Sequence, residues 1–422
     1  MQFTQKKFSN GLQLVTVPMK DNQTVTVMIL VNAGSKYETK KNNGISHFLE
    51  HMCFKGTVRR PDAHTIASEL DALGAQYNAF TGHEITGYHA KAQAKDFGKI
   101  FDVLADIYLH STFPETEMEK EKGVIIEEIN MYEDMPQRQV QEVLMQVLYG
   151  NQPAGWGVAG PRENITKMKR DDFVQYKKEH YVPRATTIVV SGNIDQKLVE
   201  IEVAKVFGSI KKAPKSDKLA VIEKQSKPAL KVQYKKTDQT HISFGFRSFD
   251  VQDKRNNALN VLTTILGGGM SSRLFMKLRE ELGVAYYVRS GADTFSDHGY
   301  VEIAAGVTNA RTQEVIQEIL HACTTLKNEL VSEKELEKAK EIIVGNLKLG
   351  LESSDSWAMY FAGEVIQQKK VRDVLEIEKT IRKISPKDIQ NIAQEVFVKK
   401  HLNLAIIGPF EQKDIDPKIL VV

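Results

Sequence analysis

The chain has 422 residues, of which 41% are hydrophobic and 26% are charged. A single hydrophobic core rarely supports this length, so we expect two or three domains of a globular protein. The 57 basic and 54 acidic residues balance to a net charge of +3, and no basic stripe with interleaved aromatic residues occurs. A nucleic acid is therefore not expected as a partner.

Neither a secretory signal nor a membrane span is expected. The first residues, MQFTQKKFSNGLQLV, lack a continuous apolar segment, and apolar runs such as VTVMILV (residues 25–31) have only the length of a strand. The two cysteines, Cys53 and Cys323, give no disulfide framework. We expect a cytoplasmic protein, in which Cys53 is a small buried thiol.

The first half of the chain begins with strands and continues with helices. Asn10-Gly11 separates FTQKKF from LQLVTVPM and is a strong hairpin signal, and TVTVMILVNAG follows as a further strand. From Gly44 the apolar spacing becomes helical, and strand-like alternation returns in QYNAFT and EITGYHAKAQ. Two long helical stretches follow, over residues 95–111 and 115–134, before a closing strand over residues 185–194.

The second half repeats this order of elements. A Lys-rich stretch without periodicity, residues 214–228, is expected to be a linker. After it come the strands LKVQYKK and HISFGFRSF, a helix, two further strands, long helices and the closing strand NLAIIGPF. The repeat predicts an α+β fold of two homologous domains, residues 1–213 and 229–422, each a mostly antiparallel sheet with helices on one face.

A histidine pair is the most specific chemical signal in the sequence. GISHFLEHMCFKGT (residues 44–57) places His47 and His51 four residues apart, with Glu50 directly before the second. Residues i and i+4 share one face of a helix, so two neutral imidazoles can reach one zinc ion. Glu50 can approach the reacting water without binding the metal itself. On this motif alone, an ordinary half-exposed helix stays the alternative.

A third ligand is expected from the glutamate-rich stretch EMEKEKGVIIEEINMYED, which offers Glu121, Glu127 and Glu128. Helical spacing places Glu128 in an apolar stripe and Glu127 about 100° round the helix. A glutamate that faces inward without a partner is costly, so Glu128 is expected to bind a metal or another cation. Glu121, two turns earlier on the same face, is a candidate to orient a ligand.

HFLEHMCFKGT, with NAFTGHEITGYHA and the glutamate-rich helix, resembles the pitrilysin/insulinase-like inverted-zincin metallopeptidases, and within them the mitochondrial and bacterial processing peptidases. The resemblance implies one zinc ion per chain, held by His47, His51 and Glu128. It further implies that Glu50 is the general base of a peptide-bond hydrolase and that Glu121 assists catalysis.

The second half contains a segment with the same resemblance. GGGMSSRLFMKLREELGVAYYV is similar to the family segment in which an arginine and a tyrosine lie seven residues apart, here Arg279 and Tyr286. In the family they hold the substrate carbonyl, and both side chains are suitable donors to a developing oxyanion. YNAF would be the edge strand that pairs with an extended substrate, with backbone contacts at Asn78 and Ala79.

These features predict a zinc-dependent endopeptidase that cleaves short or unfolded peptides inside a closed chamber without ATP. Family members of this length form half of a clamshell, and the chain carries both the zinc motif and the Arg/Tyr segment, so a homodimer is expected. The alternatives are a non-catalytic chamber or scaffold subunit, or a peptidase that needs a separate partner chain. A zinc-dependent binding protein is a more distant alternative.

Overall fold

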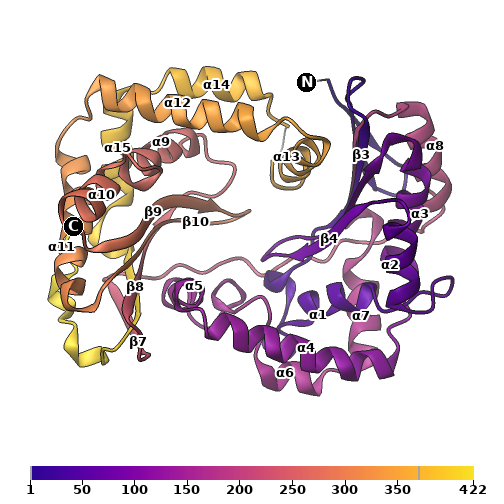
Figure 1. Cartoon of the computed structure of the whole chain (residues 1–422), viewed down its shortest axis with the longest axis horizontal. Helices are drawn as coiled ribbons and strands as arrows, with labels where there is room; N and C mark the ends of the chain where they lie inside the picture. The colour runs from indigo at the N-terminus through magenta and orange to yellow at the C-terminus, as the bar shows by residue number, and fades with distance from the viewer. Residues whose placement is uncertain (1, 369–370) are drawn as a thin grey trace. The chain divides into compact units, whose positions relative to one another are not determined.

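The computed structural model describes residues 2–368 and 371–422, which divide into two compact units (Figure 1). The first unit comprises Met1–Asn130, Trp156–Leu219 and Gly350–Val371. The second comprises Met131–Gly155, Ala220–Leu349 and Arg372–Val422. Each unit has its own sheet and its own hydrophobic core.

The first unit is built on a six-stranded sheet of order β1-β2-β6-β3-β5-β4. All neighbouring strands are antiparallel except β2 and β6. The Asn10-Gly11 hairpin predicted from the sequence joins β1 and β2, and Gly11 has the positive φ of 99° that such a turn requires. The strands are β1 (Thr4–Lys7), β2 (Gln13–Pro18), β3 (Thr24–Val31), β4 (Gln76–Thr81), β5 (Thr86–Gln93) and β6 (Thr186–Gly192).

Helices cover both faces of this sheet. Alternate residues of β3, such as Val27 and Ile29, point into the main core, where α3 packs against β3 and β5. On the opposite face, Thr26 forms a hydrogen bond of 2.9 Å with Ser354 of α13. The helices of this unit are α1 (Ile45–Cys53), α2 (Ala63–Asp71), α3 (Phe97–His110), most of α4 (Glu115–Glu133), α6 (Arg162–Lys167), α7 (Arg170–His180), α8 (Gln196–Phe207) and α13 (Ser354–Gln367).

The second unit repeats the pattern with a five-stranded sheet of order β7-β11-β8-β10-β9. Here β7 and β11 are the parallel pair, and the other neighbours are antiparallel. The strands are β7 (Ala229–Tyr234), β8 (Gln239–Ser248), β9 (Ala285–Thr294), β10 (Gly299–Thr308) and β11 (Leu402–Gly408). The helices are α5 (Pro136–Tyr149), α9 (Asn256–Gly267), α10 (Arg273–Phe275), α11 (Thr312–Asn328), α12 (Glu333–Gly350), α14 (Val374–Arg382) and α15 (Pro386–Val396).

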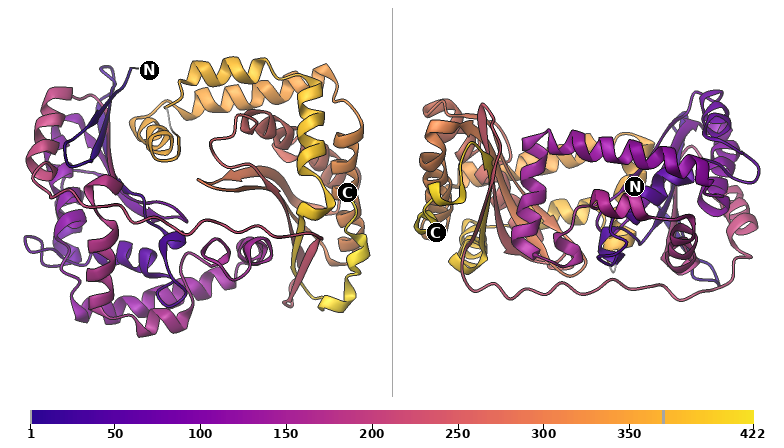
Figure 2. Two further views of the ribbon diagram at one scale, coloured as in Figure 1. Left: turned by 180° about the vertical axis from the view of Figure 1, so that it is seen from behind. Right: turned by 90° about the horizontal axis from the view of Figure 1, so that it is seen from below.

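The order β2-β6-β3-β5-β4 in the first sheet corresponds to β7-β11-β8-β10-β9 in the second. In this shared order the closing strand, β6 or β11, lies parallel to β2 or β7 and antiparallel to β3 or β8. The α+β fold class with two repeated, mostly antiparallel sheets is therefore confirmed. The expectation that helices pack on only one face of each sheet was wrong, because α13 packs on the second face of the first sheet. Residues 211–228, which include the stretch expected to be a linker, contain no helix or strand and form an extended trace (Figure 2).

The two units do not follow the chain order, because each contains a helix from the other half of the sequence. Helix α5, from the first half, packs on β8 and β11, where Leu144 and Leu148 join Ala405 and Ile407 in a small core. Helix α13, from the second half, packs on β3 and β6. The domain ranges expected from the sequence, 1–213 and 229–422, divide the chain into consecutive halves and do not include this exchange of helices. Among the described residues, none of the helices combines the length and apolar character that a membrane crossing requires.

The packing of α5 on the second sheet yields a stability prediction. Leu144 is 1% exposed. Gly245 of β8 leaves room for this side chain, because a Cβ at position 245 would lie 3.0 Å from a methyl carbon of Leu144. We expect Leu144→Ala to lower the free energy of unfolding by about 2–5 kcal/mol through the cavity it creates. Urea denaturation measures the loss.

Gln137→Ala, at an exposed position of α5, is the control and is expected to change stability by less than about 0.5 kcal/mol. An equal effect of both substitutions would contradict the assignment of α5 to this core.

Candidate metal centre

Helix α1, which carries the histidine pair, begins at a tightly fixed point. Gly44 precedes it with a φ of 102°, and a Cβ there would lie 2.5 Å from the carbonyl oxygen of Ala159. The carboxylate of Glu38 accepts hydrogen bonds from the backbone N–H groups of Gly44 and Ser46 and from the side chain of Asn43, each at 2.8 Å. These bonds satisfy donors that a helix start leaves open. Burial raises the pKa of Glu38 to about 7, although the hydrogen bonds oppose this rise.

The apolar face of α1 anchors the helix in the core of the first unit. Phe48, Leu49 and Met52 are fully buried. The rings of Phe48 and Phe173 pack edge to face, with their centroids 4.8 Å apart. Cys53 is buried with a free thiol, as expected. The remaining face of the helix carries the polar motif residues, so the amphipathic pattern of the sequence determines which side the site occupies.

Three side chains from α1 and α4 form a small triangle of ligand atoms. Nε2 of His47 and Nε2 of His51 are 3.3 Å apart. Oε2 of Glu128 lies 3.5 Å from the first nitrogen and 3.7 Å from the second. A tetrahedral zinc ion with bonds of about 2.0–2.2 Å separates its ligands by about 3.3–3.6 Å. The triangle thus has the size that a zinc ion requires, with one coordination position left for a water or substrate.

The protonation of the two imidazoles also fits a metal. Burial and the neighbouring His51 lower the pKa of His47 to about 4, so its ring is neutral. Nδ1 of His51 donates to Oε1 of Glu121 at 2.9 Å, which leaves the lone pair of Nε2 for a metal. Burial alone would lower the pKa of His51, but the bond to Glu121 and the nearby carboxylates raise it overall. Without a metal, a proton on Nε2 of His51 can be donated to Nε2 of His47, and a bound zinc ion would replace that proton.

The two glutamates of α4 have different surroundings. Glu121 is 5% exposed, and its second oxygen, Oε2, accepts from Nζ of Lys55 at 2.7 Å. Burial would raise the pKa of Glu121, but the bonds to His51 and Lys55 outweigh it and hold the pKa low. Glu127 is exposed, as the helical spacing predicts.

The apolar stripe expected around Glu128 is only partly present. Two apolar residues of that stripe, Val124 and Met131, are 51% and 49% exposed, so the stripe does not face the core along its whole width. Glu128 itself is half-buried because it faces the imidazoles of α1 rather than the interior.

Glu50 lies beside the triangle and is held by the end of β4. Oγ1 of Thr81 donates to Oε2 of Glu50 at 2.5 Å. Burial raises the pKa of Glu50, and the bond from Thr81 opposes this rise. β4 is the last strand of its sheet, and among the described residues its one partner strand is β5. Asn78 and Ala79 lie in the middle of β4, where their role in substrate binding stays a prediction.

The Arg/Tyr segment belongs to the second unit. Nη1 of Arg279 donates to the backbone oxygens of Tyr286 and Ala285, at 2.6 and 3.1 Å. The guanidinium therefore holds the first residues of β9, and the Tyr286 side chain is 58% exposed. The contact of both side chains with a substrate carbonyl stays a prediction.

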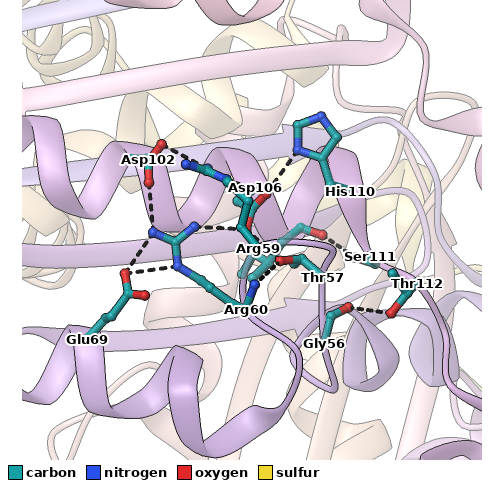
Figure 3. Close-up of polar contacts among 11 residues, drawn as sticks. Gly56, Thr57, Arg59, Arg60, Glu69, Asp102, Asp106, His110, Ser111 and Thr112 are labelled. Atoms are coloured by element: carbon teal, nitrogen blue, oxygen red, sulfur yellow. Dashed lines mark hydrogen bonds and ion pairs between the residues drawn. The ribbon is translucent and has the colours of Figure 1, made fainter.

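A buried ionic cluster fixes the loop that follows α1 (Figure 3). The carboxylate of Asp106, on α3, is fully buried and accepts from Oγ1 of Thr57 at 2.6 Å and from Nη1 of Arg60 at 2.8 Å. Arg60 also donates to Glu69 and Asp102, each at 2.7 Å. The loop that ends the metal-site helix is thereby joined to α2 and α3.

Sequence reasoning missed Glu38, Thr81 and Lys55. All three lie in or near the quoted motifs, but none has a spacing that indicates a role. Their partners lie 5 to 66 residues away in the chain, so the contacts arise only on folding.

Comparison with known proteins identifies the family. The family model described as Insulinase (Peptidase family M16) matches residues 14–162, and the model described as Peptidase M16 inactive domain matches residues 167–343. The chain is 37% identical over 400 residues to a protein of Bacillus subtilis named "Uncharacterized zinc protease YmxG", covering 95% of this chain and 97% of that one. The chain belongs to peptidase family M16.

Two further proteins are similar over nearly the whole chain. A Mycobacterium leprae protein named "Uncharacterized zinc protease ML0855" is 31% identical over 415 residues, covering 97% of this chain and 92% of that one. The crystal structure of a protease from Helicobacter pylori superposes with a TM-score of 0.90 at 23% identity, covering 97% of this chain and 99% of that one. At this identity the likeness shows the fold alone. His47, His51 and Glu128 all lie within the range of the first family model.

The Arg60 cluster gives a prediction for stability. We expect Arg60→Met to lower the free energy of unfolding by about 3–5 kcal/mol, because it leaves the buried carboxylate of Asp106 without its main cation. Arg60→Lys is expected to restore little, since one ammonium group cannot donate to three carboxylates as the guanidinium does.

Arg59→Met is the control for this prediction. Its side chain is 54% exposed and its contact with Asp106 is longer, at 3.3 Å, so we expect the substitution to cost less than about 1 kcal/mol. Chemical denaturation of the four proteins compares them, and equal losses for Arg59→Met and Arg60→Met would refute the role of the buried cluster.

Proposed function

We propose that this M16 member is a zinc-dependent endopeptidase, similar to the processing peptidases, that cleaves short or unfolded peptides without ATP. The observation that carries the proposal is the triangle of His47, His51 and Glu128, with edges of 3.3 to 3.7 Å and Glu50 beside it. It fits one zinc ion per chain. When bound, the ion polarises the scissile carbonyl and makes a water molecule more acidic.

Glu50 is the proposed general base. The bond from Thr81 occupies Oε2, and Oε1 is then directed to the reacting water. Glu50 removes one proton from the water as the water oxygen attacks the carbonyl carbon. It then delivers that proton to the nitrogen of the leaving amine, which restores its carboxylate.

Three further groups position the substrate or a ligand in this proposal. Glu121 fixes the ring of His51 through Nδ1. The backbone of Asn78 and Ala79, on the edge strand β4, pairs with an extended peptide. Arg279 and Tyr286 donate to the carbonyl oxygen, and because Nη1 of Arg279 already holds β9, its remaining N–H groups make the contact.

The mechanism predicts a specific loss in Glu50→Gln. We expect the variant to bind zinc as the wild type does, but to cleave a quenched fluorescent peptide library with kcat lower by about 10²–10⁴-fold. A chelator should abolish wild-type cleavage, and added zinc should restore it.

Cleavage by zinc-loaded Glu50→Gln at the wild-type rate would show that the mechanism is wrong. Absence of cleavage by the zinc-loaded wild type would favour a separate partner chain or a scaffold role.

We further propose that the protein acts as a cytoplasmic homodimer. The resemblance to two-domain family members supports this, since such chains form half of a chamber and this one carries both groups of site residues. Light scattering is expected to give about twice the chain mass of 47.6 kDa. A monomer at the concentration used for the peptidase assay would contradict the dimer.

A further inference from the structure

Lys55 is a charged side chain at the metal centre that the proposed mechanism does not use. It follows the end of α1, where its backbone N–H donates to the carbonyl oxygen of Met52 at 3.2 Å. Its ammonium group lies 2.7 Å from Oε2 of Glu121, whose other oxygen accepts from Nδ1 of His51 at 2.9 Å. One carboxylate therefore connects the lysine to the imidazole.

The burial of Glu121 gives this contact its importance. The side chain of Glu121 is 7% exposed, whereas that of Lys55 is 23% exposed. A carboxylate that has left water and has only one partner can turn about its side-chain torsions. With both oxygens occupied, its plane and distance to His51 are fixed. The lysine also neutralises a buried charge that would otherwise be costly.

The two glutamates of α4 lie on opposite sides of the His51 ring. Glu121 and Glu128 are seven residues apart and share one helix face. Glu128 lies 3.7 Å from Nε2 of His51, on the metal side of the ring. Glu121 lies at Nδ1, on the other side, where Lys55 holds it.

We propose that Lys55 is a positioning residue for the metal centre, which holds Glu121 on Nδ1 of His51 and so keeps Nε2 directed at the metal. The inference rests on the proposed zinc function of this site. It makes Lys55 part of the arrangement that fixes the tautomer of His51, although Lys55 touches neither metal nor substrate.

A second lysine of the same region provides a matched comparison. Nζ of Lys122, on α4, lies 2.8 Å from Glu119, but the Glu119 side chain is 66% exposed. Ion pairs with exposed partners contribute little, about 0–1 kcal/mol. Lys122→Met therefore removes a Lys–Glu ion pair of similar length whose glutamate does not contact a histidine.

The test measures zinc affinity of the full chain by competition with a chromogenic chelator. We expect Lys55→Met to bind zinc about 10- to 100-fold more weakly, as is typical when a partner of a metal-binding histidine is lost. Lys55→Arg should remain within about threefold of the wild type, because a guanidinium can also donate to Glu121. Lys122→Met should match the wild type, and thermal unfolding confirms that each variant is folded.

A second readout needs neither zinc nor activity. In the metal-free protein, at a pH high enough that His51 is neutral despite its raised pKa, nitrogen NMR should show His51 protonated at Nδ1 only in the wild type and in Lys55→Arg. In Lys55→Met we expect a mixture of the two tautomers, because Glu121 is no longer held.

Unchanged zinc affinity and an unchanged tautomer in Lys55→Met would overturn the inference. Weaker zinc binding in Lys55→Met, together with a wild type that cleaves no peptide, would support the role of Lys55 and refute the peptidase. The two proposals can therefore fail separately.

Discussion

The fixed position of α1 is the constraint on which the candidate site depends. Buried carboxylates hold both ends: Glu38 accepts from the first turn, and Asp106 anchors the loop beyond the last turn through Thr57 and Arg60. Between them the apolar face of the helix is buried in the core. A metal centre needs its ligand atoms placed to within a few tenths of an ångström, and a helix fixed at both ends meets that need without a metal.

The second helix of the site is positioned both by the core and by polar contacts within the site. Ile125 of α4 is fully buried in the core of the first unit, although part of the helix around Glu128 is exposed. The contacts of Glu121 with His51 and Lys55 connect α4 to α1 and to the residues that follow it. Packing therefore holds the helix, and the polar contacts fix how its carboxylates meet the imidazoles.

Local pattern was enough to predict much of this structure. The histidine spacing, the helical period that separates Glu127 from Glu128, the Asn10-Gly11 hairpin and the repeated strand order each depend on residues near one another in sequence. The contacts of Glu38, Thr81 and Lys55 depend on which segments meet after folding. An amphipathic pattern likewise predicts that α5 and α13 bury an apolar face, but not which sheet receives it.

The exchange of helices affects how the chain can mature as it is synthesised. Thr26 of β3 is among the first residues made, yet its partner Ser354 is 328 residues later. At about 5–20 residues per second, the ribosome needs roughly 15 to 70 s to make the intervening chain. During that time one face of the first sheet lacks its helix. The nascent protein therefore exposes a surface to which chaperones can bind and through which the chain can associate prematurely.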